Sequence, residues 1–139
     1  MAEQPEPLVG IVVVSHSATI AEGVVELAAQ MAGPEVRLLA AGGAADGSLG
    51  TDAGRIADAI TRADAGAGVV VLADLGSAVL SAKLALDMID PEIAARTRLS
   101  VGPLVEGAVV AAVQASAGDS LAAVLEAAEE AAHLPKDVT

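Results

Sequence analysis

Two polar residues, His16 and Asp74, stand where two apolar segments of the sequence end. His16 is flanked by Ser15 and Ser17 and is one of only 2 histidines in the chain. A neutral imidazole is a good nucleophile near pH 7. An aspartate beside it can accept the N–H of one ring nitrogen, fix the tautomer and leave the other nitrogen free to attack. The two residues are therefore the predicted reactive centre.

Phosphoryl transfer is the chemistry that suits a single histidine of this kind, because it depends mostly on positioning and charge stabilisation. A helix that begins after His16 would offer unpaired N–H groups and the positive end of its dipole to a phosphate on the imidazole. Both residues also have purely structural interpretations. His16 can be a hydrogen-bonded residue at a strand end, and Asp74 can cap a helix that starts at Ser77. The residues alone leave these interpretations open.

Alternating strands and helices must bring these residues together. Apolar, β-branched runs predict buried strands at residues 8–14, 36–41 and 69–73, with a short fourth strand near residues 98–101. Helical periodicity follows each strand, and Gly-Pro and Asp-Pro pairs end two of the helices. This order predicts a three-layer α/β fold with a mostly parallel central sheet and helices on both faces. Reactive groups of such sheets gather at the carboxyl ends of the strands, where His16 and Asp74 are expected.

The glycine-rich segment 42–50 also follows a predicted strand, but it does not predict a nucleotide site. It lacks the Gly-Lys-Ser/Thr ending of a P-loop and does not match Gly-x-Gly-x-x-Gly. We interpret it as a flexible loop beside His16. Thr51 and Asp52 are interpreted as caps of the next helix, although Thr51 could also donate a hydrogen bond to a bound phosphate.

Charge and composition exclude several classes of partner and cofactor. The 19 acidic and 7 basic residues give a net charge of −12, which disfavours nucleic acid and anionic membranes and favours a basic protein partner. The chain lacks Phe, Trp and Tyr, so it offers no aromatic platform for bases. Without Cys, and with only His16 and His133, it predicts no metal site. No signal peptide or membrane helix is predicted, so we expect a soluble, cytoplasmic protein.

Four short motifs occur in order along the chain. They are Val-Val-Val-Ser-His-Ser at residues 12–17, Gly-Thr-Asp at 50–52, Asp-Leu-Gly-Ser-Ala at 74–78 and Gly-Pro-Leu-Val-Glu-Gly at 102–107. Together they resemble the phosphoryl-donor subunit of PTS-dependent dihydroxyacetone kinase, a mannose-type IIA domain of the phosphotransferase system (PTS). The resemblance runs from about residue 8 to about residue 132. Each motif is weak alone, and it is their order and spacing that make the resemblance specific.

The resemblance implies roles and partners. His16 would be the phosphorylated residue, and Asp74 would be its hydrogen-bond partner. The phosphocarrier HPr would supply the phosphoryl group, and ADP bound on a second kinase subunit would accept it. This subunit itself would bind no cofactor and no metal, and it would form a homodimer. The phosphocarrier domain would span residues 8–133, between a disordered N-terminal tail at 1–7 and a C-terminal tail at 134–139.

Two alternatives remain. A IIA domain of a mannose-class sugar transporter would have the same fold and chemistry with a membrane-associated acceptor, although the motifs at 74–78 and 102–107 favour the kinase branch. A regulatory module would instead signal through phosphorylated His16 without turnover of a metabolite. Some relatives continue into HPr-like and enzyme I-like domains. Because this sequence ends at Thr139, we expect its phosphoryl donors to be separate proteins.

Overall fold

Four parallel strands form one sheet in the computed structural model, which describes residues 6–137. The sheet has the order β2-β1-β3-β4. Its strands are β1 (Gly10–Ser15), β2 (Leu38–Gly42), β3 (Val69–Ala73) and β4 (Thr97–Leu99). Each neighbouring pair is parallel. The predicted tails at residues 1–7 and 134–139 lie partly outside the described residues.

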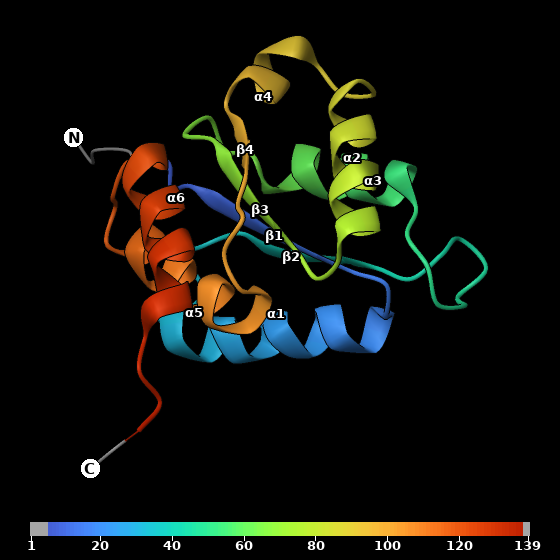
Figure 1. The fold of residues 1–139 in the computed structure, drawn as a ribbon. Helices are drawn as coiled ribbons and strands as arrows, with labels where there is room; N and C mark the ends of the chain where they lie inside the picture. Colours follow the sequence, from blue (N-terminus) through green and yellow to red (C-terminus); the bar gives the residue numbers. More distant parts are fainter. Residues whose placement is uncertain (1–5, 138–139) are drawn as a thin grey trace.

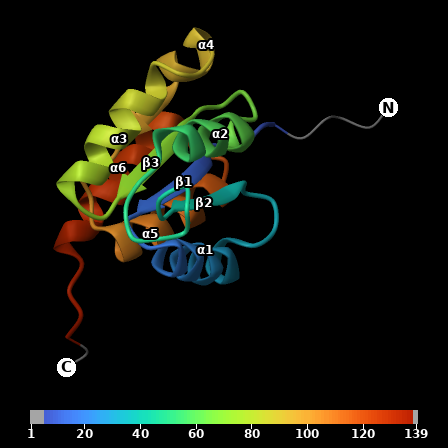
Figure 2. The same cartoon turned by 90° about the vertical axis from the view of Figure 1, so that its right-hand side faces the viewer.

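Helices cover both faces of this sheet, as Figures 1 and 2 show. On one face pack α1 (Ala18–Ala32), α5 (Leu104–Ser116) and α6 (Leu121–Glu130). On the other face pack α2 (Ala53–Ala63) and α3 (Gly76–Leu86). The three-layer α/β prediction is confirmed. Within the described residues, no helix is long and apolar enough to cross a membrane.

Two short elements were not predicted from the sequence. The Asp90-Pro91 pair, interpreted above as the end of a helix, begins α4 (Pro91–Ala95) instead, because the Asp90 carboxylate accepts the N–H of Glu92 at 2.8 Å. A 3₁₀ turn, η1 (Ala131–His133), extends α6. Strand β4 is also shorter than predicted and ends at Leu99.

The central strands have no solvent-facing side, which explains their continuous apolar sequences. In β1, Ile11 and Val13 face the layer of α1, α5 and α6, whereas Val12 and Val14 face the layer of α2 and α3. All four side chains are fully buried. A strand covered on both faces gains from an apolar residue at every position rather than at alternate ones.

Alanine is the commonest buried residue of the helices, and in α3 it is the only one. In α3, Ala78, Ala82 and Ala85 are buried, while Leu80 and Leu84 are more than half exposed. Because alanine carries no atoms beyond Cβ, a helix with an alanine face can lie close to the strands without an aromatic residue to fill space. The larger apolar side chains of α3 are left on the outer surface, where they remain available for contact with another protein.

A partly buried ion pair joins the end of α2 to the segment that enters β4. The Arg96 guanidinium donates to both carboxylate oxygens of Asp64, at 2.9 Å from Nε and 2.6 Å from Nη2. The Asp64 side chain is only 6% exposed. The hydrogen bonds from Arg96 hold the pKa of the Asp64 carboxyl below its usual value, although burial opposes this shift. The pair fixes the end of α2 against the segment that enters β4.

We expect Asp64→Asn to lower the free energy of unfolding by about 2 kcal/mol, because a charged acceptor of two hydrogen bonds is lost at a partly buried site. A carboxyl whose pKa is lowered on folding stabilises the protein above its unfolded pKa, and this contribution disappears as the pH falls through the folded pKa. The variant should therefore lose less stability between about pH 5 and pH 2 than the wild type does. Urea denaturation across this pH range measures both effects.

Asp58→Asn is the matched control for this prediction. Asp58 lies 3.7 Å from Arg62, and both side chains are about two-thirds exposed. An exposed pair of this kind contributes about 0.5 kcal/mol or less. Equal losses in the two variants would contradict a special role for the Asp64–Arg96 pair.

Candidate active site

His16 and Asp74 lie at the carboxyl end of the two central strands. His16 follows β1 and Asp74 follows β3, and the Asp74 N–H donates to the carbonyl of Val14 at 3.1 Å. After β1 the chain enters α1 on one face of the sheet, whereas after β3 it enters α3 on the other face. From β1 the chain adds β2 on one side of the sheet, and from β3 it adds β4 on the other side. The crevice between β1 and β3 is therefore the topological switch point, where open parallel sheets usually bind a ligand. The structure thus brings the two predicted residues together.

The Asp74 carboxylate accepts four hydrogen bonds. Oδ1 accepts from His16 Nδ1 at 2.9 Å and from the N–H of Leu75 at 2.8 Å. Oδ2 accepts from the hydroxyl of Ser15 at 2.8 Å and from the N–H of His16 at 3.0 Å. The carboxylate therefore holds both the ring and the backbone of His16.

These hydrogen bonds determine the charge of Asp74. Partial burial by itself would raise the pKa of the Asp74 carboxyl, but hydrogen bonds from His16, Ser15 and Leu75 outweigh burial and lower it below its usual value. A carboxyl group with a lowered pKa is ionised at every pH above about 4. Asp74 is therefore an anion across the physiological range and can only accept hydrogen bonds.

The tautomer of His16 follows from the charge of Asp74. Because the carboxylate only accepts, Nδ1 carries the proton, and Nε2 of the neutral ring carries the lone pair. The Ser77 hydroxyl lies 2.5 Å from Nε2 and donates to it in this tautomer. The His16 side chain is 26% exposed, so an approaching group can reach the ring. The site thus presents one oriented nucleophilic nitrogen.

Ser77 has a different position from the one predicted. The structural interpretation above placed it at the start of a helix capped by Asp74, but α3 begins one residue earlier, at Gly76, with Leu75 at the cap and no side chain bonded there. Ser77 lies inside the first turn, and its hydroxyl faces His16 rather than the helix backbone. The sequence gives one signal for this role, since Ser77 stands three residues after Asp74, at the start of the same helix.

Ser15 is a second residue whose role the sequence did not reveal. Its side chain is fully buried at the end of β1, and it donates to Asp74 Oδ2 while it accepts the N–H of Ser17 at 3.0 Å. The Ser17 hydroxyl in turn accepts the N–H of Ile20 and caps α1. Ser15 therefore links the orientation of the carboxylate to the start of the helix that follows His16.

The glycine-rich segment lies beside the site, as expected. The N–H of Gly50 donates to the carbonyl of His16 at 2.8 Å. At Gly42, a Cβ atom would lie 2.6 Å from the carbonyl oxygen of Ser17, so only glycine allows this approach. Asp52 caps α2 as predicted. The Thr51 hydroxyl is engaged with Ser81 at 2.6 Å, so in this structure it is not free for a phosphate.

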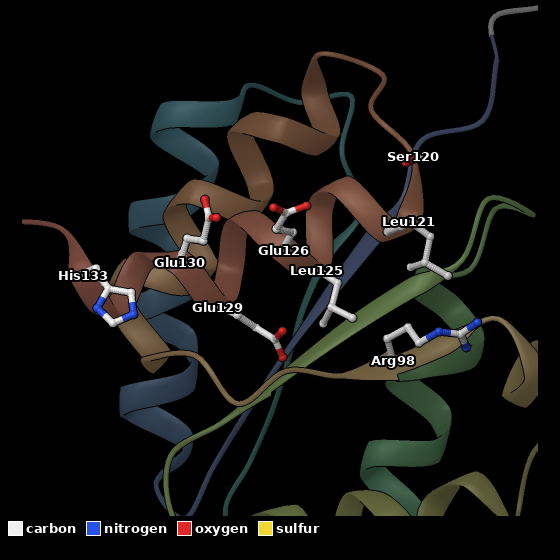
Figure 3. Close-up of a pocket in the computed structure, with 9 residues that line it drawn as sticks. Arg98, Ser120, Leu121, Leu125, Glu126, Glu129, Glu130 and His133 are labelled. Atoms are coloured by element: carbon white, nitrogen blue, oxygen red, sulfur yellow. The ribbon is translucent and has the colours of Figure 1, made fainter.

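One surface groove lies away from these residues. It runs along α6 and β4, with a volume of about 630 Å³, between Arg98 at one end and His133 at the other (Figure 3). Arg98 donates to the carbonyls of Ala95 and Thr97. Neither His16 nor Asp74 lines this groove. Within residues 6–137 there is no group of three or more side chains suited to a metal ion.

Comparison with known proteins identifies the class of this fold and site. A family model described as EIIA-man, PTS system fructose IIA component, matches residues 10–125. The crystal structure of EF1359, described as a protein of unknown function, is 41% identical, with a TM-score of 0.79, and the match covers 88% of this chain and 94% of that one.

Relatives in sequence narrow the assignment. The Listeria innocua protein named PEP-dependent dihydroxyacetone kinase 2, phosphoryl donor subunit DhaM, is 42% identical over 86% of this chain and 95% of its own length. The Providencia stuartii phosphoryl donor subunit DhaM is 40% identical over 89% of this chain, which spans only 27% of that longer protein. The chain belongs to the EIIA-man family and, within it, to the DhaM phosphoryl donor subunits of dihydroxyacetone kinase.

The tautomer of His16 is directly testable without any partner protein. In ¹⁵N spectra of histidine-labelled protein at pH 8, we expect His16 to show a protonated Nδ1 and an unprotonated Nε2. Asp74→Asn should shift His16 toward a mixture of tautomers, because an amide can donate to Nδ1 as well as accept from it. The exposed His133 provides the reference signals in the same spectra. A wild-type His16 protonated at Nε2 would contradict the assignment.

Proposed function

We propose that this chain carries a phosphoryl group on Nε2 of His16, receives it from phosphorylated HPr and passes it to ADP bound on the partner subunit of dihydroxyacetone kinase. One observation supports this most strongly. Nδ1 is occupied by an ionised Asp74, which leaves Nε2 as an oriented, accessible nucleophile. The names of the relatives, phosphoryl donor subunits, agree with this role. As the family resemblance implies, we also propose that the chain acts as a homodimer.

The first transfer forms the Nε2–P bond as the P–N bond to the donor histidine breaks, and the electron pair of that bond returns to the donor nitrogen. Positive charge develops on the His16 ring, and the Asp74 carboxylate stabilises it through Nδ1–H. In the second transfer an oxygen of ADP attacks phosphorus and the Nε2–P bond breaks. The ring is then neutral again, with its proton still on Nδ1.

Ser77 has to change its partner during this cycle. Its hydroxyl lies on Nε2, where the phosphorus atom would bind, so it must turn away as the donor approaches. From the first turn of α3 it can then donate to a phosphoryl oxygen. The N-terminus of α3 has no side-chain cap, so its free N–H groups and dipole also favour negative charge there. In this proposal, Ser77 and α3 stabilise the phosphoryl group while Asp74 stabilises the ring.

Incubation with phosphoenolpyruvate, enzyme I and HPr tests the carrier role. We expect intact mass spectrometry to show one acid-labile phosphoryl group on the wild type and on His133→Ala, and none on His16→Ala. His133→Ala is the matched control, because His133 is the other histidine of the chain and is exposed. A phosphorylated His16→Ala protein would disprove the mechanism.

The acceptor is tested by adding the ADP-loaded kinase subunit with its dihydroxyacetone-binding subunit. We expect the phosphorylated protein to lose its phosphoryl group as dihydroxyacetone phosphate forms. Transfer only to the membrane component of a mannose-class transporter would favour the sugar-transport alternative. Phosphorylation without passage to either acceptor would favour a regulatory module.

Asp74→Ala should slow phosphorylation of His16 without abolishing it, because Asp74 orients the ring and does not bond to phosphorus. Loss of a carboxylate that orients an imidazole at a metal site costs about 10–100-fold in activity, and we expect an effect of this order here. The initial rate of mass gain at fixed phospho-HPr measures it. Because the fold must remain intact for this comparison, circular dichroism of the variant is the control. An unchanged rate in a folded variant would remove the orienting role.

A further inference from the structure

Ser15 is the one polar side chain of β1, and it is fully buried. A strand that is covered on both faces gains from an apolar residue at every position, so a larger apolar side chain here would bury more apolar surface. A buried hydroxyl costs free energy unless it is hydrogen-bonded. Such departures from the pattern of the core are typical of functional sites. Packing alone therefore does not account for a serine at this position.

The two hydrogen bonds of the Ser15 hydroxyl have a fixed direction. Its oxygen accepts the N–H of Ser17 at 3.0 Å, and its single proton is donated to Asp74 Oδ2 at 2.8 Å. This direction cannot reverse, because the ionised carboxylate only accepts and the N–H only donates. The other carboxylate oxygen, Oδ1, lies 2.9 Å from His16 Nδ1. Ser15 and the ring of His16 thus bind different oxygens of one carboxylate.

Donors on both oxygens restrict the rotation of the Asp74 carboxylate. The last torsion of an aspartate side chain has broad energy minima, so an unrestrained carboxylate turns easily. Oδ2 accepts from the Ser15 hydroxyl and from the N–H of His16, whereas Oδ1 accepts from the ring and from the N–H of Leu75. The Ser15 hydroxyl is itself fixed at the start of α1 by Ser17, the residue that caps this helix. Without Ser15, Oδ2 would keep one donor of its two.

Thr97 and Ser100 are also buried polar residues, and their hydroxyls bond to the local backbone. Thr97 donates to a carbonyl of α4 at 2.7 Å. The Ser100 hydroxyl accepts the N–H of Gly102 at 2.9 Å. This is a bond to the second residue along the chain, of the same kind as the bond between Ser15 and Ser17. Within residues 6–137, only Ser15 of these three donates to another side chain.

We propose that Ser15 is a positioning residue for phosphoryl transfer, which acts through Asp74: its hydroxyl holds the carboxylate in the orientation in which Oδ1 meets Nδ1 of His16. The inference rests on the proposed function. Because Ser15 is fully buried, it cannot touch a donor or an acceptor protein. Its effect on transfer should therefore appear in the maximal rate and not in the concentration of donor that gives half that rate.

Spectra of the unphosphorylated protein test this hold on the carboxylate without any partner. At pH 8, we expect the ¹⁵N signals of His16 in Ser15→Ala to shift part of the way toward the tautomer mixture of Asp74→Asn, because a carboxylate that turns holds Nδ1–H less firmly. Ser100→Ala is the matched control, since it removes a buried hydroxyl that makes the same local bond but does not reach Asp74. It should leave the signals of His16 as they are in the wild type.

The initial rate of mass gain against increasing phospho-HPr tests the effect on transfer. Ser15→Ala should lower the maximal rate about three- to tenfold, the effect of about one hydrogen bond on a barrier, and leave the half-saturating concentration unchanged. Ser15→Ala added to Asp74→Ala should lower the rate no further, because the residue through which it acts is gone. Ser15→Cys has a similar shape but only a weak donor, so it carries the same prediction and replaces Ser15→Ala if that variant does not fold.

An additional loss of rate in the double variant would overturn the positioning role and leave the carrier role intact, because Ser15 would then act independently of Asp74. An unchanged maximal rate or unchanged His16 signals in folded Ser15→Ala would overturn it as well, and so would an equal loss of rate in Ser100→Ala. If the wild type gains no phosphoryl group, the proposed function fails, and a positioning role in transfer fails with it.

Discussion

The hydrogen bonds of the Asp74 carboxylate are the interaction on which the site depends. They join the ends of the two central strands, fix the ring and the backbone of His16, and keep the carboxyl ionised against the cost of its partial burial. An ionised, multiply bonded carboxylate can hold only one tautomer of the imidazole, so charge and geometry decide which ring nitrogen of His16 carries the lone pair. Ser15, fully buried beneath it, makes this arrangement part of the core rather than of the surface.

The core supports the site through close packing of small side chains. The strands supply Val and Ile on both faces, and the helices meet them mostly with alanine, as in the buried row Ala108, Ala111, Ala112 and Ala115 of α5. Interiors packed in this way do not deform easily, so the strand ends are a rigid base for His16 and Asp74. Larger apolar side chains such as Leu75, Leu80 and Val101 lie at the surface instead. Exposed apolar side chains of this kind are available for contact with another protein.

The architecture was predictable because several independent sequence signals indicate the same strands and helices. Apolar runs of strand length, helical periodicity between them and Gly or Pro at the ends specify alternating strands and helices, and right-handed crossovers then require a parallel sheet. The elements that were missed or misplaced are short. α4 has five residues and β4 has three, so neither holds enough residues to show a period. Their ends are set by contacts such as the Asp64–Arg96 pair, which joins residues 32 positions apart.

The sequence by itself determined the fold class and the family, and it singled out the two residues, His16 and Asp74, that the structure brings together, because these depend on local pattern and on residue type at strand ends. Only the tertiary structure decided what surrounds them. The sequence does not show what the hydroxyls of Ser15 and Ser77 bind. They acquire their partners because β1 and β3 are neighbours and α3 begins beside the ends of these strands. The Asp64–Arg96 pair is likewise a tertiary property, because its members lie 32 positions apart in the sequence. A charge is paired or unpaired according to what lies near it in space, and linear order does not record that distance.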